Sequence, residues 1–297
     1  MSETRRRWLA IVNPACGGMR HREFRETWLR RLRYTATKVV ICERPGDAAH
    51  IVAEERDFDG IAAVGGDGTV FDILPALDAS RQCLTVFPAG RGNSLARAMG
   101  FTSMPLAMAG LKYGVEQPMD LLLLQAKHAD GRTTKAICAG GVAVGYVASV
   151  VARAGSFANA GLHSYTLAGL LTKPERSQIE ISYDGETPKS RSLTGLGISN
   201  ISYAAQYRVF PDARLDDGRL HAMEFDAPRL RQIRHNVSML AGFYPSVPRR
   251  AGQTVQVRAP VPFDLTADGE ILHGVTEFSV ACVSGAILCN RGAGELR

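Results

Sequence analysis

The stretch VGGDGTV at residues 64–70 sets one acidic residue, Asp67, among three glycines and just before Thr69. Glycine has no Cβ, so its backbone N–H groups can come close to phosphate oxygens. A carboxylate in such a loop would repel phosphate unless a cation lies between them, and Mg²⁺ prefers carboxylate oxygens as ligands. The stretch therefore indicates a phosphate and magnesium site. A tight strand-to-helix turn that binds no ligand is the alternative.

Two further glycine-bearing loops occur, NPACGG at 13–18 and PAGRGN at 88–93. The Walker pattern GxxxxGK[ST] is absent, and neither GDGTVF nor GRGNSL supplies the third glycine of GxGxxG. The usual nucleotide fingerprints therefore do not describe these loops. At Gly66 we expect a positive φ angle, which branched residues resist.

Short apolar runs predict the strands that position these loops, at residues 9–12, 37–42, 61–64 and 84–87. Helical spacing or helix-forming composition follows at 24–32, 45–56, 70–77 and 94–99, with Pro75 shortening the third helix. Strands that alternate with helices predict an α/β fold with a mostly parallel sheet. Since ligands bind beyond the carboxyl ends of such strands, the three glycine loops should gather at one edge.

The pattern changes after residue 124, where alternating segments such as QIEISYDGE and TVQVRA predict antiparallel strands. We therefore expect an α/β domain at 1–124 and an all-β or β-rich domain at 125–297. The final segment is a candidate to return to the first domain. Residues 136–152 carry no charge, but their glycines and small side chains favour a buried strand running into a packed helix over a membrane span.

Composition bounds the class of protein. The chain has 297 residues, 45% of them apolar, with a net charge of +6, which favours anionic partners. Its six cysteines are widely spaced without a CxxC pair, so a zinc site is not expected and reduced thiols fit the cytoplasm. No signal peptide is recognisable at the N-terminus.

The motifs together resemble one family. GGDGT at 65–69 followed by PAGRGNSLARAMG at 88–100 is similar to the diacylglycerol kinase catalytic-domain family, which includes bacterial lipid kinases and sphingosine and ceramide kinases. The opening NPxxGG loop, PGDA at 45–48, PDARLDDG at 211–218 and DGE at 268–270 extend the resemblance. NAD kinases share GGDGT, whereas PAGRGNSLARAMG and PDARLDDG indicate the lipid branch.

The resemblance implies a NAD-kinase-like α/β nucleotide-binding domain followed by a β-rich, sandwich-like domain, with ATP and Mg²⁺ bound between them. The γ-phosphoryl group would pass to a lipid hydroxyl, diacylglycerol- or sphingoid-like. Asp67 would lie beside the cation, Glu270 would be the catalytic base, and Asp216 and Asp217 would hold a magnesium ion that orders the second domain. The nucleotide phosphates would contact Asn13, Gly65, Gly66, Gly68, Thr69, Gly90, Gly92 and Asn93.

Several positions depart from the family pattern. Ser94 stands where many bacterial members have aspartate, Phe71 replaces an asparagine, and Ala139 precedes Gly140 where another asparagine is usual. These departures keep open a catalytically weak lipid- or nucleotide-binding protein, and the shared GGDGT keeps open a NAD-type kinase of a soluble nucleotide. The DDG and DGE stretches are also ordinary hairpin signals, and Asp120 is the next candidate for the base.

The expected partner is a lipid substrate at an anionic membrane surface. On the predicted helix 228–240, arginines at 229, 231 and 234 alternate with apolar residues, and a basic amphipathic helix can lie on an anionic bilayer. We expect a cytoplasmic protein that is peripheral to the inner face of the membrane, with a homodimer left open. Nucleic-acid binding is not expected, because no RNA-binding fingerprint or zinc-finger spacing occurs.

Overall fold

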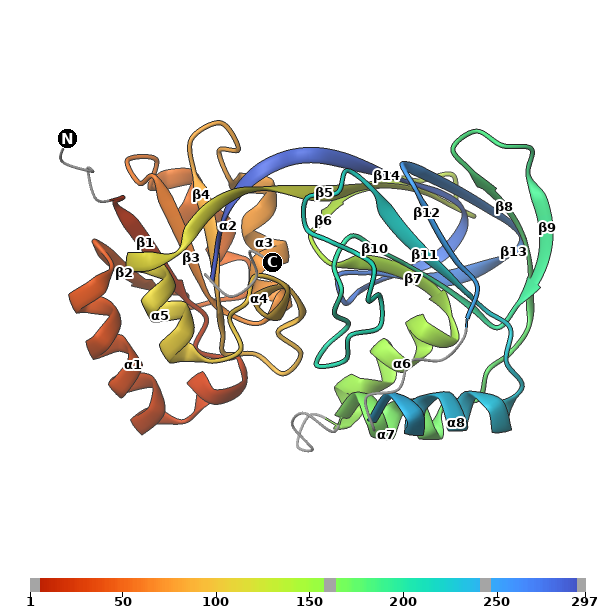
Figure 1. Ribbon diagram of the computed structural model, residues 1–297, viewed down its shortest axis with the longest axis horizontal. Coiled ribbons are helices and arrows are strands. Elements are labelled where there is room, and N and C mark those ends of the chain that lie inside the picture. Colours follow the sequence, from red (N-terminus) through yellow and green to blue (C-terminus); the bar gives the residue numbers. More distant parts are fainter. Residues whose placement is uncertain (1–5, 158–163, 241–246, 293–297) are drawn as a thin grey trace. The chain divides into compact units, whose positions relative to one another are not determined.

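The computed structural model describes residues 6–157, 164–240 and 247–292. It divides into two compact units, unit 1 (Met1–Met119 and Gly285–Arg297) and unit 2 (Asp120–Ser284). The division falls a few residues before the boundary expected at 124, and the C-terminal segment belongs to unit 1. Two long strands, β5 (Val115–His128) and β14 (Glu270–Arg291), contribute residues to both units (Figure 1).

Unit 1 is built on a parallel sheet. Its strands β1 (Trp8–Val12), β2 (Lys38–Ile41), β3 (Gly60–Gly65) and β4 (Cys83–Pro88) pair in the order β2-β1-β3-β4. The end of β14 pairs in parallel with β4. All residues of β1 and β3 are buried, as a sheet covered on both faces requires. The four strands predicted for this region are confirmed.

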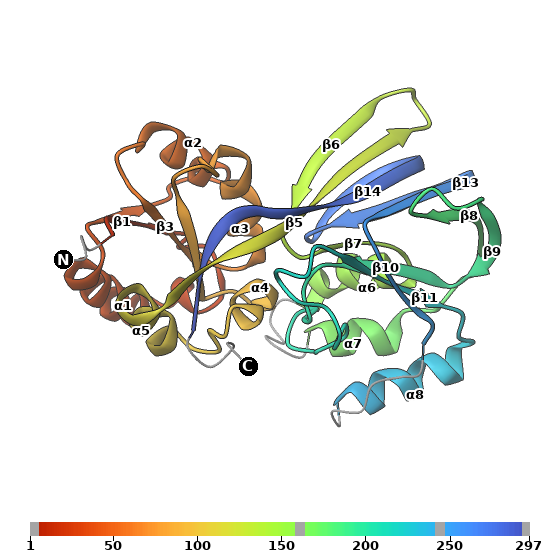
Figure 2. The same ribbon diagram turned by 45° about the horizontal axis from the view of Figure 1, so that its top comes forward.

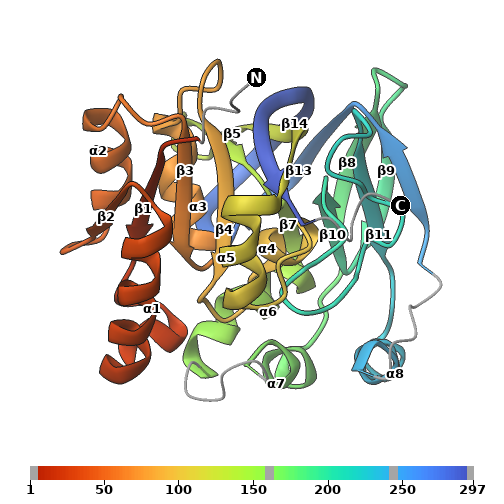
Figure 3. The ribbon, with the colours of Figure 1, turned by 60° about the vertical axis from the view of Figure 1, so that its left-hand side comes forward.

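Helices connect these strands: α1 (Arg22–Thr35), α2 (Asp47–Glu54), α3 (Asp67–Ile73), α4 (Ser94–Ala98) and α5 (Met104–Tyr113). Figure 3 looks onto the side of unit 1 that carries α1 and α5. Pro75 lies in a 3₁₀ turn that ends α3. The strand order reverses between β1 and β3, so the loops that follow these two strands flank the switch point where ligands of α/β sheets bind.

Unit 2 contains a largely antiparallel sheet in the order β12-β11-β10-β7-β13-β14. The β8–β9 pair adds to β13, and β5 joins β6 to β14 (Figure 2). Buried apolar residues from most of these strands form one continuous core, which agrees with the predicted β-rich domain. The remaining bounds are β6 (Thr133–Cys138), β7 (Gly141–Gly145), β8 (Ser177–Tyr183), β9 (Lys189–Leu193), β10 (Gly195–Ser199), β11 (Leu220–Phe225), β12 (Arg249–Gly252) and β13 (Thr254–Ala267).

Three helices lie on one side of this sheet, α6 (Tyr146–Ala154), α7 (Ser164–Leu171) and α8 (Arg229–Leu240) (Figure 1). The α6 helix packs against β7 and β10, α7 packs against α6, and α8 against α7. The uncharged run at 136–152 ends β6, forms β7 and enters α6, as its small side chains predict. Among the described residues, no helix is long and apolar enough to cross a membrane.

Candidate active site

The three glycine loops of unit 1 are in direct contact at the carboxyl edge of its sheet. A Cβ added to Gly17 would lie 2.4 Å from the carbonyl oxygen of Ala89. One added to Gly90 would lie 2.3 Å from the Cα atom of Gly66. Backbone therefore packs on backbone at both junctions, which only glycine permits. The prediction that these loops gather at one edge is confirmed.

Asn13 and Thr69 tie the first loop to the second. The Asn13 side-chain amide donates to Thr69 Oγ1 at 3.1 Å, and the Asn13 backbone N–H donates to the Val64 carbonyl at 3.0 Å. Thr69 is buried, and a Cβ added to Gly65 would lie 2.2 Å from its Oγ1 atom. Both side chains are engaged in hydrogen bonds or packing within the protein, so they shape the loop.

Asn93 closes the third loop into a compact turn. Its φ angle is 56°, its side-chain amide donates to the Gly90 carbonyl at 2.9 Å, and its Oδ1 atom accepts the Gly90 N–H at 2.8 Å. The Gly65 carbonyl accepts the N–H groups of both Ala89 and Gly90. The turn that contains Gly92 is therefore anchored to the end of β3.

Gly66 and Gly68 are glycines for different reasons. Gly66 has φ −104° and ψ −172°, an extended conformation, so the expected positive φ is wrong. What constrains Gly66 is Gly90, whose Cα would lie 3.1 Å from an added Cβ. Gly68 is the second residue of α3 and has no positive φ, and apart from the backbone of its own helix no described atom lies within 4 Å of an added Cβ. Neither packing nor backbone conformation requires glycine at position 68.

The Asp67 carboxylate caps the helix that follows the third loop. It accepts hydrogen bonds from the Ser94 N–H at 3.1 Å, the Ser94 hydroxyl at 3.2 Å and the Leu95 N–H at 3.2 Å. This role was not predicted from the sequence. A second carboxylate at position 94 would repel Asp67 unless a cation lay between them, whereas serine donates to it. Three of about four acceptor positions are used, so room for a cation contact remains.

Cys16 lies in the first loop, where a thiolate would add negative charge. Burial raises the pKa of the Cys16 thiol to about 11. Its Sγ atom lies 3.0 Å from the Asn13 carbonyl oxygen, to which the thiol donates. The thiol therefore stays protonated at neutral pH and adds no negative charge beside the glycine loops.

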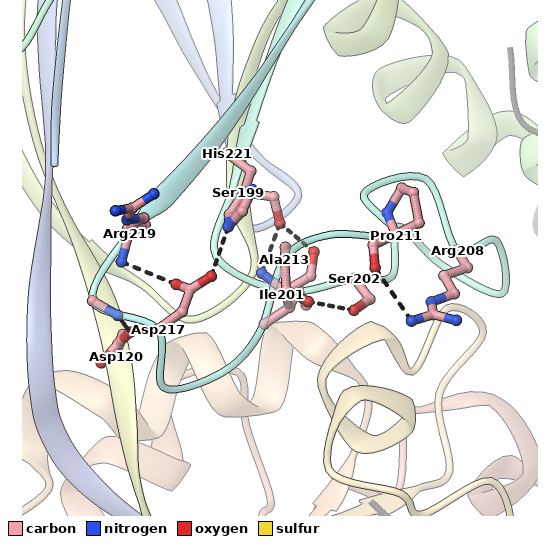
Figure 4. A network of polar contacts seen from close by, with 11 residues as sticks. Asp120, Ser199, Ile201, Ser202, Arg208, Pro211, Ala213, Asp217, Arg219 and His221 are labelled. Atoms are coloured by element: carbon pink, nitrogen blue, oxygen red, sulfur yellow. Dashed lines mark hydrogen bonds and ion pairs between the residues drawn. The ribbon is translucent and has the colours of Figure 1, made fainter. Parts of the chain in front are cut away.

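In unit 2 the DDG loop is held by a polar network (Figure 4). The Asp217 carboxylate accepts the Arg219 N–H at 3.0 Å and lies 2.8 Å from His221 Nε2. Asp120, which is 1% exposed, accepts the Gly218 N–H at 2.6 Å. The contact between Asp217 and His221 was not predicted, although a histidine four residues after an aspartate is a sequence signal for it. Asp120 thus supports this loop from within the core.

The predicted metal ligands belong to both units, Asp67 to unit 1 and Asp216 and Asp217 to unit 2. Across residues 6–157, 164–240 and 247–292, no group of three His, Cys, Asp or Glu side chains is arranged to hold a metal ion. Asp216 is exposed, and Asp217 already has His221 as its partner. A magnesium ion at these two residues therefore stays a prediction, and one with which His221 would compete.

The DGE stretch forms the turn between β13 and β14. Asp268 and Gly269 have φ angles of 47° and 100°, which a type I′ turn requires at both positions. The Asp268 carboxylate accepts the N–H groups of residues 139–141 at 2.6, 2.9 and 2.7 Å. Glu270 is exposed and pairs with Ala267 through the backbone, and within the described parts of the chain its carboxylate has no hydrogen bond or ion pair. A rigid turn thus presents an unpaired carboxylate.

Comparison with known proteins agrees with these motifs. The family model for the diacylglycerol kinase catalytic domain matches residues 7–124, which include all three glycine loops. A protein named diacylglycerol kinase from Bacillus subtilis is 29% identical over 197 residues, covering 64% of this chain and 62% of that relative. One of the same name from Staphylococcus saprophyticus is 24% identical over 251 residues, covering 79% and 78%. The chain thus matches less than two thirds of the Bacillus subtilis protein.

Solved structures have the same fold. One described as a diacylglycerol kinase from Bacillus anthracis superposes with a TM-score of 0.76 at 19% identity, covering 97% of this chain and 98% of that one. A second structure from that organism gives a TM-score of 0.79, with 99% of both chains covered. At this identity the likeness concerns the fold, a NAD-kinase-like α/β unit with a β-rich unit. The family-model match at residues 7–124 covers less than half of the chain, so these comparisons show a likeness to bacterial proteins named diacylglycerol kinase in sequence and in fold.

Proposed function

We propose that the protein is an ATP- and Mg²⁺-dependent kinase that transfers the γ-phosphoryl group to the hydroxyl of a diacylglycerol- or sphingoid-like lipid. The observation that carries the proposal is Gly68. It is the second residue of α3, where alanine would be more favourable by up to about 1 kcal/mol, and neither packing against the described residues nor a positive φ requires glycine there. A ligand that approaches the backbone of this loop would require it.

In this proposal the ATP phosphates bind the backbone of the glycine loops. Gly66, Gly68 and Gly90 would let the phosphates approach the backbone, Gly92 is buried within its turn, and Gly65 is needed for packing against Thr69. Asn13, Thr69 and Asn93 hold the loops in place through the bonds described above. The Asp67 carboxylate keeps one acceptor position for the cation. When bound with ATP, magnesium would neutralise phosphate charge, which is most of what phosphoryl transfer needs from its site.

Glu270 is the proposed base. Its carboxylate is exposed and unpaired in the described residues, and the turn before it is fixed by the three bonds of Asp268. A general base must be ionised and within reach of the hydroxyl whose proton it takes. The other carboxylates considered fit less well, because Asp120 is buried in the core and Asp67 caps α4.

The substrate would reach the enzyme at the inner face of an anionic membrane. Leu230 and Val237 of α8 are 79% and 52% exposed, and Leu171 of the neighbouring α7 is 52% exposed. Arginines 229, 231 and 234 are exposed on α8, and neither helix contains an acidic residue. Apolar side chains beside unopposed positive charge favour an anionic bilayer, so we propose a peripheral protein.

A NAD-type kinase of a soluble nucleotide is the alternative activity. The names of the curated relatives and the PDARLDDG stretch support the lipid acceptor. Transfer of radiolabel from [γ-³²P]ATP, measured in parallel to a panel of diacylglycerols, sphingoid bases and ceramides and to NAD, separates the two. Label in a lipid supports the proposal. Label in NADP alone overturns it, and tight ATP binding without any transfer indicates a binding protein.

A further inference from the structure

Arg91 is the single basic residue of the three glycine loops, taken as residues 13–18, 65–69 and 89–94. Its side chain is exposed. Neither the family resemblance nor the argument from glycines gives Arg91 a role, because both concern the glycine backbone next to it. Its place in the third loop nevertheless gives it a fixed relation to the first and second loops.

The backbone of Arg91 is anchored on both sides. Before it, the N–H groups of Ala89 and Gly90 donate to the Gly65 carbonyl at 3.0 and 3.1 Å. After it, the Asp67 carboxylate accepts the N–H groups of Ser94 and Leu95. The Asn93 side chain also closes the turn on Gly90. The short turn that carries Arg91 is therefore fixed to Gly65 and Asp67 of the GGDG loop.

The charge of this edge needs such a residue. A nucleoside triphosphate brings several negative charges, and Asp67 adds another, whereas the described loops offer only neutral N–H groups besides Arg91. Backbone groups serve the phosphates that lie against the loops, while a long side chain can extend past the backbone to the outermost phosphate. Arginine does this well, because its planar guanidinium donates two parallel hydrogen bonds to phosphate oxygens.

We propose that Arg91 binds the terminal phosphate of ATP and stays on it during transfer, an assignment that rests on the proposed kinase activity. The acceptor hydroxyl oxygen forms a bond to the γ-phosphorus while the bond to the β–γ bridging oxygen breaks. The hydroxyl proton passes to Glu270, and ADP leaves. Arg91 makes and breaks no covalent bond, since its part is to hold the phosphoryl oxygens and neutralise their charge.

The test compares ATP and ADP, which differ by the phosphate in question. Dissociation constants for both, with Mg²⁺, are measured by calorimetry for the unsubstituted protein, Arg91→Gln, Arg91→Lys and the control Arg33→Gln, which removes an exposed charge from α1. We expect Arg91→Gln to weaken ATP binding roughly 10–100-fold, as for the loss of one charged hydrogen bond, and ADP binding less than about 3-fold. Arg91→Lys should fall between, and the control should be unchanged.

The melting temperature of each variant shows whether it is folded, and Arg91→Lys replaces Arg91→Gln if the latter unfolds. An unchanged ratio of ATP to ADP affinity in the folded variant overturns the Arg91 assignment while leaving the kinase proposal intact. Failure of the unsubstituted protein to bind either nucleotide overturns the kinase proposal, and the assignment with it.

Discussion

At the scale of single residues, the carboxylates divide into those that hold loops and one that holds nothing. Asp67, Asp217 and Asp268 accept backbone N–H groups, whereas Glu270 is exposed and unpaired among the described residues. The sequence predicted all four as site residues or their neighbours, but it could not separate them. Asp268 and Glu270 stand two positions apart with the same chemistry, and the partners that distinguish them come from strands far along the chain.

Glu270→Gln tests the base. The substitution keeps the size of the side chain and removes its charge, so the rate of lipid phosphorylation should fall roughly 10²–10⁴-fold. ATP affinity and melting temperature should stay close to those of the unsubstituted protein, because the Glu270 side chain is exposed and its carboxylate has no hydrogen bond or ion pair in the described structure. Equal turnover at saturating ATP and lipid would mean that another group takes the proton.

At the scale of elements, the strands and their loops were predictable because each short apolar run ends in a glycine-bearing turn. The structural reason for each glycine could not be predicted. A positive φ was expected at Gly66, but its backbone is extended and packs against Gly90. Contacts between loops that lie 24 residues apart leave no local signal in the chain.

Gly90→Ala and Gly68→Ala separate packing from ligand approach. The first puts a methyl group 2.3 Å from the Gly66 Cα atom, so we expect the free energy of unfolding to fall by about 1–3 kcal/mol. The second enters open space in a helix and should raise it by up to about 1 kcal/mol. Gly68→Ala should nevertheless weaken ATP binding. Unfolding curves and calorimetry measure both quantities. Normal ATP affinity in Gly68→Ala would remove the argument built on that glycine.

The DDG loop gives a second prediction at this scale. His221→Ala removes the partner of Asp217, a half-buried pair whose side chains are 13% and 20% exposed. We expect a stability loss of about 1 kcal/mol, the net contribution of a typical hydrogen bond within a protein. Added Mg²⁺ should then raise the melting temperature of the variant more than that of the unsubstituted protein, because the carboxylate becomes available. Magnesium binding at Asp217 would be contradicted if Mg²⁺ raised the melting temperatures of His221→Ala and of the unsubstituted protein equally. It would also be contradicted if Mg²⁺ raised the melting temperature of a His221→Ala/Asp217→Asn variant as much as that of His221→Ala.

At the scale of the whole molecule, the sequence predicted an α/β unit and a β-rich unit from the change in periodicity after residue 124. The structure adds that one strand, β14, begins in unit 2 and ends beside β4 of unit 1. Pairing between the last strand and the fourth is a long-range contact, which periodicity does not encode. The helix 228–240 was predictable, because its spacing of apolar residues is local.

Binding to vesicles tests the membrane face. Arg231→Glu/Arg234→Glu reverses two exposed charges on α8, and binding to vesicles that contain phosphatidylglycerol should fall by at least about tenfold, with each charge worth about 1 kcal/mol near the surface. Arg30→Glu/Arg33→Glu on α1 is the matched control. Sedimentation with vesicles at two salt concentrations measures the effect. An equal loss in both variants would mean that net charge, not α8, governs binding.

The most direct test of the central proposal is the initial rate of phosphate transfer from ATP to diacylglycerol in mixed micelles with Mg²⁺, for the unsubstituted protein and for Asp67→Asn. Asparagine keeps an oxygen acceptor for one of the two N–H groups of α4 that Asp67 accepts, and it loses the charge that would face the cation. We predict labelled phosphatidic acid from the unsubstituted protein, and a rate at least about 10²-fold lower from a folded Asp67→Asn. Equal rates for the two proteins, or label that appears in NADP and in no lipid, would contradict the account.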